Sequence, residues 1–404
     1  MLSVNDALVR ITDALIPLPA ETIALADAAG RVLAEDVISR RTQPPVPVSA
    51  MDGYAVRAED VAAAPVALTV VGAAPAGGAY DRRLGPGQAV RIFTGGPVPE
   101  GADSIVMQEL TETEGTSVKV NESVHRGEFV RRAGLDFSAG DPVPRAGQVL
   151  TARAIGLIAA MDVPWVSVRR RPKVALLANG DELVRPGEAV GANQIISSNT
   201  LALAALIQGN GGEAIDLGIA RDDPDSLRTL ARNAKGADLL ITLGGASVGD
   251  HDLVQSALGD MGLDVNFWKI AMRPGKPLIF GRMGDAPMLG LPGNPVSALV
   301  CGLIFVIPAL RKLLGQIAGP ILRCNAVLGG PLPANGNREA YLRGTLERRD
   351  DGNLVATLFD LQDSSVLSGM AGAGCLVVQP PLGPARSAGD AIEVIPFPEM
   401  FTNI

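Results

Sequence analysis

The chain has 404 residues, of which 47% are hydrophobic and 19% are charged; this length predicts about two to four domains, and this composition is typical of globular rather than disordered protein. The formal net charge of −8 argues against a global positive field that would hold nucleic acid. The three cysteines form no CxxC pair, which argues against a disulfide framework or a thiolate metal site.

The first twenty residues predict a short amphipathic helix. Ser3 and Asp6 form a capping-box pattern ahead of apolar residues at helical spacing. The charged residues Asp6, Arg10 and Asp13 interrupt any apolar core that a signal peptide would need. We therefore expect a cytoplasmic protein.

The local composition of the chain then changes twice. Between residues 46 and 145, short β-prone pieces stand between Gly and Pro clusters; examples are Ala67–Val71, Ala89–Phe93 and Ser104–Met107. The Ala-, Ile- and Leu-rich segment Thr151–Met161 is expected to return and pack on the N-terminal helices. We predict a helical N-terminal linker domain of residues 1–45 and 146–170, interrupted by a small inserted β domain of residues 46–145.

Residues 171–318 predict an α/β domain. Apolar runs of strand length alternate with helical patterns, at Lys173–Ala178, Thr200–Gln208, Glu213–Gly218, Asp225–Ala234, Asp238–Leu243, a helix from about Asp252, Leu278–Phe280, Met288–Leu291 and a long closing helix. This order is typical of a mostly parallel sheet covered by helices. The longest uncharged run, Pro295–Leu310, falls short of the roughly 18–20 residues of a bilayer span. We expect a core helix there and no membrane contact.

The remaining residues, 319–404, return to strand texture and predict a C-terminal β domain. The expected strands are Tyr341–Leu346, Leu354–Phe359, Leu376–Gln379 and Ala391–Ile395, separated by Gly, Asp and Pro. The predicted fold class is therefore multidomain α/β, with a mostly parallel α/β domain, an inserted small β domain, a helical N-terminal domain and a C-terminal β domain.

A glycine-rich turn follows the predicted strand Asp238–Leu243. It contains Gly244, Gly245, Ser247 and Gly249. Ahead of a helix, such a turn can present converging N–H groups to a phosphate or another oxyanion, although a structural tight turn is an equally good interpretation of the glycines alone. Asp252 favours the anion site, because a carboxylate beside a phosphate implies an intervening hard cation such as Mg²⁺.

Acids also follow the strand Lys173–Ala178, where Asp181 and Glu182 stand after Asn179 and Gly180. They suit an N-cap and solvated turn, or a second carboxylate contribution to a metal or a substrate amine. The sequence leaves both interpretations open.

The segment 268–277 carries three cations, Lys269, Arg273 and Lys276, on a backbone stiffened by two prolines and a glycine. Cations held at fixed positions suit phosphate-like oxygens. The turn 290–297 holds Pro292 and Pro295. Asn294 as a cap and Pro295 at the first helical position explain part of this turn, and its side-chain-poor approach allows a flat ligand to lie close to the backbone.

Two tight turns of the inserted β domain carry a polar residue at the bend, Asp52 in MDGYA and Thr94 in TGGPVP, and Asp136 is a third polar candidate. With two histidines in the whole chain, a Ser/His/Asp hydrolase or a multi-histidine metal centre is difficult to build. The site is expected to use oxygen ligands and cations.

In their order and spacing, the segments MDGYA, TGGPVP, NGDEL, GGASVGDHD, FWKIAMRPGKP and GLPGNPVSA resemble the molybdopterin molybdenumtransferase family, which includes the E domain of gephyrin. The resemblance spans nearly the whole chain. It implies a four-domain subunit that forms a homodimer, with an active site between the molybdopterin-binding α/β domain of one subunit and other domains of its partner.

The resemblance also implies the chemistry. Molybdate enters the dithiolene of adenylylated molybdopterin with Mg²⁺ as cofactor, AMP leaves, and a molybdopterin adenylyltransferase is a candidate partner. By position, Asp52, Thr94, Asp136, Glu182 and Asp252 would be catalytic. Asp252 and Glu182 would also hold Mg²⁺. The implied substrate-binding residues are Asp222, Gly244, Gly245, Ser247, Gly249, Lys269, Arg273, Lys276, Pro292 and Pro295.

The chain departs from the family pattern at Ala50, where proline is common, at Asn179, where Thr or Ser is usual, and at Arg273, where lysine is common. None of these changes removes a charge from the implied site. The alternatives are a non-catalytic scaffold of the same fold and a relative sharing only the α/β domain, such as a molybdopterin adenylyltransferase or a nicotinamide-nucleotide deamidase. The sequence does not distinguish between molybdate and tungstate as the oxyanion substrate.

Overall fold

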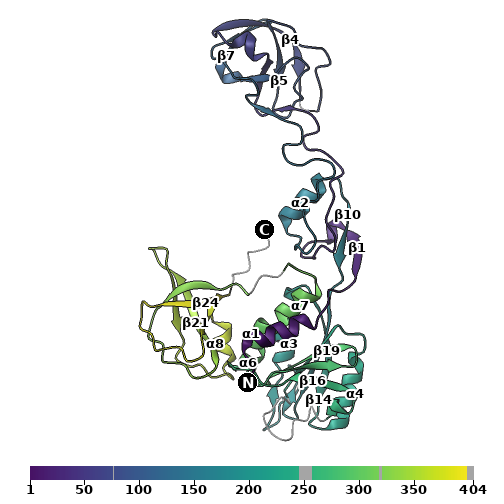
Figure 1. The fold of residues 1–404 in the computed structure, drawn as a ribbon, viewed down its shortest axis with the longest axis vertical. Coiled ribbons are helices and arrows are strands. Elements are labelled where there is room, and N and C mark those ends of the chain that lie inside the picture. The colour runs from purple at the N-terminus through teal and green to yellow at the C-terminus, as the bar shows by residue number, and fades with distance from the viewer. Residues whose placement is uncertain (76, 245–256, 318–320, 398–404) are drawn as a thin grey trace.

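The computed structural model describes residues 1–75, 77–244, 257–317 and 321–397 and shows an elongated subunit (Figure 1). A β domain lies at one end, and an α/β domain and a C-terminal β domain lie together at the other. Between them lies a small unit built around α2 (Ala152–Ala160).

The α/β domain is centred on a six-stranded sheet. Its strand order is β14 (Glu213–Ala220), β11 (Lys173–Asn179), β15 (Leu239–Leu243), β19 (Ala286–Leu291), β18 (Ile279–Met283) and β16 (Leu263–Phe267). The neighbours from β14 to β19 are parallel, whereas β18 runs antiparallel to both β19 and β16. The mostly parallel sheet is therefore confirmed, and β16 is an edge strand that the sequence analysis did not predict.

Both faces of this sheet are covered. Along β11, Val174 and Leu176 pack into a core shared with α3 (Asn199–Gly209). Ala175 and Leu177 point to the opposite core, which includes α4 (Pro224–Ala231). Burial on two faces explains why the strand is a continuous apolar run rather than an alternating one. Short elements complete the domain: β12 (Leu183–Val184), β13 (Ile195–Ile196) and the 3₁₀ helix η4 (Arg232–Ala234).

The closing helix is built from α6 (Pro295–Cys301), a π-helical segment (Gly302–Val306) and α7 (Ile307–Leu313). The helical run has 19 residues and extends beyond the uncharged run Pro295–Leu310 as far as Leu313. Pro308 has no N–H to donate within the helix. It lies in the first turn of α7, directly after the π-helical segment, where the regular hydrogen-bond pattern is already interrupted. By length and composition the run could cross a membrane, but 72% of its most apolar 18-residue stretch is buried inside the protein. It is a core helix, as predicted.

The opening helix α1 (Val4–Asp13) and its predicted cap are confirmed. Ser3 Oγ accepts a hydrogen bond from the Asp6 N–H at 3.0 Å and donates to Asp6 Oδ2 at 2.7 Å. The buried face of α1, including Ala7 and Ile11, belongs to the core of the α/β domain and packs beside α7. The helix therefore covers the α/β domain instead of receiving the segment Thr151–Met161.

That later segment forms α2, which packs on the chain between residues 25 and 37. The cluster contains Leu25, Ala28, Leu33, Val37, Ile158 and Met161. Beside it, β1 (Ala20–Ala24) pairs antiparallel with β10 (Trp165–Arg169), and β1 is followed by the 3₁₀ helix η1 (Leu25–Asp27). The return of the chain to its N-terminal part is confirmed, but its partner is this segment and not α1.

The inserted β domain has a six-stranded sheet of order β6 (Ser104–Met107), β3 (Gly53–Val56), β5 (Gln88–Ile92), β4 (Val66–Ala74), β8 (Ser117–Val120) and β7 (Thr111–Glu114). The pair β2 (Val48–Ser49) and β9 (Val130–Arg131) lies at its base, and the 3₁₀ helices η2 (Ala58–Val61) and η3 (Gln108–Leu110) complete it. Of the three β-prone pieces expected from sequence, Ala67–Val71 and Ser104–Met107 lie wholly in strands, and Ala89–Phe93 does so as far as Ile92.

The C-terminal domain is a closed barrel of order β21 (Glu339–Arg348), β22 (Leu354–Leu358), β20 (Cys324–Leu328), β24 (Ala391–Pro396) and β23 (Cys375–Gln379), because β21 also pairs with β23. A short helix, α8 (Leu367–Ala371), precedes β23. The four expected strands are confirmed, and β20 is additional. From the α/β domain, β17 (Met272–Arg273) adds to β21.

Candidate active site

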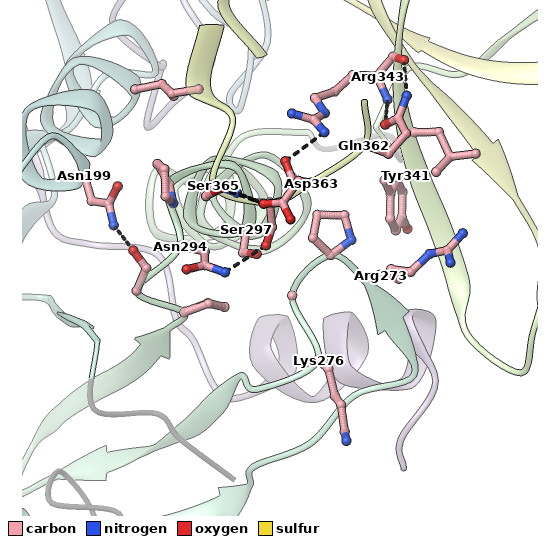
Figure 2. A pocket seen from close by; sticks show the side chains of 18 of the residues that line it. Asn199, Arg273, Lys276, Asn294, Ser297, Tyr341, Arg343, Gln362, Asp363 and Ser365 are labelled. Atoms are coloured by element: carbon pink, nitrogen blue, oxygen red, sulfur yellow. Dashed lines mark hydrogen bonds between the residues drawn. The ribbon is translucent and has the colours of Figure 1, made fainter. Parts of the chain in front are cut away.

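A cleft of about 1940 Å³ lies between the carboxyl ends of the α/β strands and the C-terminal barrel (Figure 2). Parallel strands place their following turns at one edge of the sheet, so β11, β15 and β19 all deliver residues to this cleft. Seven of the residues proposed from sequence line it: Glu182, Asp222, Gly244, Arg273, Lys276, Pro292 and Pro295.

The acidic side of the cleft follows β11. The side chain of Asn179 is 5% exposed, and its Nδ2 donates a hydrogen bond of 2.7 Å to Asp222 Oδ1. The main-chain N–H of Asp222 donates in turn to Asp181 Oδ1 at 3.3 Å. Gly180 has φ +152°, and a Cβ there would lie 2.5 Å from a carboxylate oxygen of Glu182. The turn therefore links Asp222 to Asn179 and Asp181 by hydrogen bonds and places the carboxylate of Glu182 over Gly180.

Of the glycine-rich turn, the structure describes Gly244. Its φ is +89°, and a Cβ there would lie 2.6 Å from the Asn179 carbonyl oxygen, so the position requires glycine. The other members proposed for the site, Gly245, Ser247, Gly249 and Asp252, lie outside the described residues, as does the predicted start of the following helix.

The basic segment is fixed by the N-terminus and by the barrel. The Leu2 N–H donates to the Lys269 carbonyl at 3.2 Å, and the Ala271 N–H donates to the Leu2 carbonyl at 2.7 Å. On the other side, Arg273 pairs in register with Ala340 of β21. Figure 2 shows Arg273 beside Tyr341 at the barrel side of the cleft. Arg273 and Lys276 thus reach the cleft from a braced loop.

Lys269 does not belong to the described lining of this cleft. Its ammonium lies 3.7 Å from the ring centroid of Trp268, a distance at which the ring's negative face attracts the cation. The three cations predicted to act together are therefore split, with one held against an aromatic ring.

Within the basic segment, Gly275 packs against the sulfur atoms of Cys301 and Met272. It has φ +107°, and a Cβ there would lie 2.6 Å from Cys301 Sγ and 3.1 Å from Met272 Sδ. Burial raises the pKa of the Cys301 thiol, so this sulfur is a neutral packing atom.

The proline turn joins three parts of the chain. Asn294 occupies the N-cap position of α6, but its side chain makes no cap bond. Instead, Asn294 Nδ2 donates to Ser364 Oγ at 2.8 Å, and the Val296 N–H donates to the Ser364 carbonyl at 3.1 Å. Asn199 Nδ2 donates to the Gly293 carbonyl at 2.6 Å (Figure 2). The predicted cap position is confirmed, while the helix terminus is satisfied by the barrel.

The barrel contributes a cleft wall that sequence reasoning missed. Arg343 is 1% exposed, and its guanidinium donates to the carbonyl of Val366 at 2.8 Å. It also donates to the carbonyl of Asp363 at 2.9 Å (Figure 2). Asp363 accepts bonds from the Ser365 hydroxyl and N–H, and these bonds lower the pKa of Asp363. A local signal existed in the Asp-Ser-Ser sequence, which is typical of a side-chain-capped turn.

The remaining site residues lie outside the α/β domain, and Asp52 and Thr94 belong to the inserted β domain at the far end of the subunit (Figure 1). One carboxylate oxygen of Asp52 accepts hydrogen bonds from the Thr94 N–H at 2.7 Å and the Thr94 hydroxyl at 2.8 Å. These two bonds, with a smaller contribution from the Arg91 charge, lower the pKa of Asp52. Asp136 lines a separate groove of about 780 Å³ with Gly95. The candidate site is therefore divided between two ends of one subunit.

The comparisons with known proteins cover all these parts. Residues 2–161 match the family model of the MoeA N-terminal region (domain I and II). Residues 175–312 match the probable molybdopterin binding domain, and residues 325–397 match the MoeA C-terminal region (domain IV).

Relatives match over most of the chain. A molybdopterin molybdenumtransferase from Haemophilus influenzae is 35% identical, covering 98% of this chain and 99% of that protein. One from Nostoc sp. is 42% identical, covering 82% of this chain and 78% of that protein. A crystal structure of a molybdopterin biosynthesis MoeA protein from Pyrococcus horikosii has a TM-score of 0.82 and 32% identity, covering 99% of this chain and 100% of that one.

Fold and cleft thus define a multidomain MoeA-type protein with its candidate site at the strand ends of a molybdopterin-binding type of domain. The chain belongs to the molybdopterin molybdenumtransferase family. The family predicted from the sequence motifs is confirmed.

Proposed function

We propose that the protein inserts molybdate into adenylylated molybdopterin and releases AMP, as a transferase of molybdenum cofactor biosynthesis. The relatives' names and the three matching domain models support this reaction class. The structural observation that carries it is the cleft, which places carboxylates after β11 and β14 and cations from the basic segment around one volume.

The two kinds of charge have separate tasks. Arg273 and Lys276 reach the cleft from a loop braced on both sides, so they bind the oxygens of molybdate and phosphate at fixed positions. The substrate supplies both sulfur ligands of the molybdenum, which fits a chain whose Cys301 and Cys375 are buried.

Mg²⁺ is the proposed cofactor. Among the described residues no cluster of three or more metal-ligating side chains is present. Glu182 and Asp222 nevertheless line the cleft as a pair of carboxylates, and Mg²⁺ commonly binds through one or two carboxylates together with substrate phosphates. This donor set fits, with Asp252 proposed as a further ligand. When bound, Mg²⁺ would neutralise charge on the anhydride oxygens.

The division of the site supports a homodimer. Asp52 and Thr94 lie at the end of the subunit remote from the cleft (Figure 1). We propose that the inserted β domain of one subunit, with Asp52, Thr94 and Asp136, faces the cleft of its partner. We also propose that the protein acts in the cytoplasm, where a molybdopterin adenylyltransferase supplies the substrate.

The test is to incubate the purified protein with adenylylated molybdopterin, molybdate and Mg²⁺. The proposed function requires AMP release coupled to formation of molybdenum-loaded cofactor. Adenylation of free molybdopterin would identify an adenylyltransferase instead, and release of ammonia from a nicotinamide nucleotide would identify a deamidase. Absence of turnover with each substrate would favour a scaffold.

A further inference from the structure

Arg91 cross-links the two turns that carry Asp52 and Thr94. It lies on β5, opposite Tyr54 of β3 in the register of the two strands. Its Nη1 donates to the Gly53 carbonyl at 3.0 Å, and its Nη2 donates to the side-chain oxygen of Gln108 at 2.5 Å. Both hydrogen-bond partners are neutral, so neither cancels the guanidinium charge.

Two aromatic rings also hold this guanidinium. Its central carbon lies 5.2 Å from the ring centroid of Tyr54 and 4.9 Å from that of Phe93. At these distances the faces of both rings attract a cation. A planar guanidinium can stack on rings and donate two directed hydrogen bonds at once, whereas a lysine ammonium cannot reproduce this geometry.

Three of the residues that Arg91 contacts, Gly53, Phe93 and Gln108, are directly connected to Asp52 or Thr94. Gly53 follows Asp52 and Phe93 precedes Thr94 in the chain. The Gln108 N–H donates to the Asp52 carbonyl at 3.1 Å. The Arg91 charge also helps to keep Asp52 ionised, after the larger effect of the two Thr94 hydrogen bonds on its pKa. Arg91 is therefore connected to both turns by contact and to the carboxylate by charge.

We propose that Arg91 is a positioning residue for the molybdenum-insertion reaction, holding the turns that carry Asp52 and Thr94 in one geometry. This inference rests on the proposed function and adds to it a residue absent from the set suggested by the family resemblance. Arg91 is assigned to act through Asp52 rather than on the substrate, because both hydrogen bonds and both ring contacts of its guanidinium go to Gly53, Gln108, Tyr54 and Phe93 of this domain.

The experiment is a double-mutant cycle on AMP release in single turnover, in the full-length protein. Arg91→Met is expected to lower the rate constant on the order of 100-fold, since small misplacements of catalytic groups have effects of that size, with KM changing much less. Arg91→Lys should recover little of the loss. In an Asp52→Asn background, adding Arg91→Met should change the rate by less than about threefold, because both changes act through one group.

Arg82→Met is the matched control, an exposed arginine of the same domain, and should behave as wild type. Equal rate losses from Arg91→Met with and without Asp52 would overturn the proposal, as would full activity of Arg91→Lys. If Arg91→Met does not fold, the same cycle with Arg91→Lys decides. Absence of AMP release by the wild type would refute the proposed function itself, whereas an active wild type matched by Arg91→Met refutes this inference alone.

Discussion

Asn179 holds Asp222 in place at the acidic side of the cleft, through a hydrogen bond of 2.7 Å between Nδ2 and Oδ1. The other end of the same amide, Oδ1, is buried with no hydrogen-bond partner among the described residues. The contact joins the end of β11 to the turn after β14. It is made by a side chain that departs from the Thr or Ser usual in the family pattern.

Replacing Asn179 with alanine is expected to impair substrate binding more than folding. Asn179→Ala removes the side-chain donor to the Asp222 carboxylate, so KM for adenylylated molybdopterin should rise at least about tenfold, the scale of one hydrogen bond to a charged group. The free energy of unfolding should change by less than about 1 kcal/mol, because the lost hydrogen bond is offset by removal of an unsatisfied buried oxygen. Initial rates and chemical unfolding measure the two quantities.

Thr242→Val is the control for this change. Thr242 Oγ1 is also buried without a hydrogen-bond partner among the described residues, but Thr242 does not line the cleft. It should leave KM unaltered. An Asn179→Ala enzyme with wild-type KM would show that the contact does not position Asp222 for the substrate.

Removing the charge of Arg273 is expected to weaken binding of the anionic substrate. Arg273→Ala should raise KM at least about tenfold, the scale of a lost charge-assisted contact, and should reduce the dependence of KM on ionic strength. Arg273→Lys should keep most of the affinity. Arg273 is exposed, so thermal unfolding should not change. Lys235→Ala, an exposed cation of the same domain outside the cleft, should match wild type; an equal loss there would contradict a local role for Arg273.

The sequence predicted the cleft residues that follow parallel strands, because the carboxyl ends of such strands always meet at one edge of a sheet. Glu182 and Pro292 could be assigned to one cleft on that basis, whereas Arg273 follows β16, a strand that was not predicted. The sequence could not separate Lys269 from the other two cations, because its capture by Trp268 depends on side-chain directions in the folded loop.

The place of Arg343 in the barrel wall of the cleft could not be predicted, for a different reason. Arg343 is a buried cation satisfied by main-chain carbonyls of a loop some twenty residues later, and nothing in its local sequence marks that environment. The packing of α1 was missed in a similar way. The spacing of its apolar residues predicted a helix, but this spacing does not indicate which surface the helix packs against. In the structure that surface is the α/β core beside α7.

Thiol reactivity should distinguish the three cysteines. Burial raises the pKa of the Cys301 thiol and raises that of Cys375 to about 12. Both thiols therefore stay protonated at about pH 8, and the thiolate is the reactive form. A chromogenic disulfide reagent should titrate Cys324, which is partly exposed, and should reach all three thiols after unfolding in guanidinium. Rapid loss of more than one thiol in the native protein would contradict the buried positions, and Cys324→Ser should abolish the native reaction.

The position of the basic segment depends on the close packing of Gly275 against Cys301. Gly275→Ala places a Cβ only 2.6 Å from Cys301 Sγ, on a backbone with φ +107°. The strained backbone and the overlap should together destabilise the protein by about 2–4 kcal/mol and should shift Arg273 and Lys276, raising KM. In the double variant Gly275→Ala/Cys301→Ala the overlap with the Cys301 sulfur is removed, but the backbone strain and the tight contact with Met272 Sδ remain. Part of the stability and of the affinity should therefore return, measured against Cys301→Ala alone. If the double variant is no more stable than the sum of the two single changes implies, the sulfur contact does not determine the position of this loop.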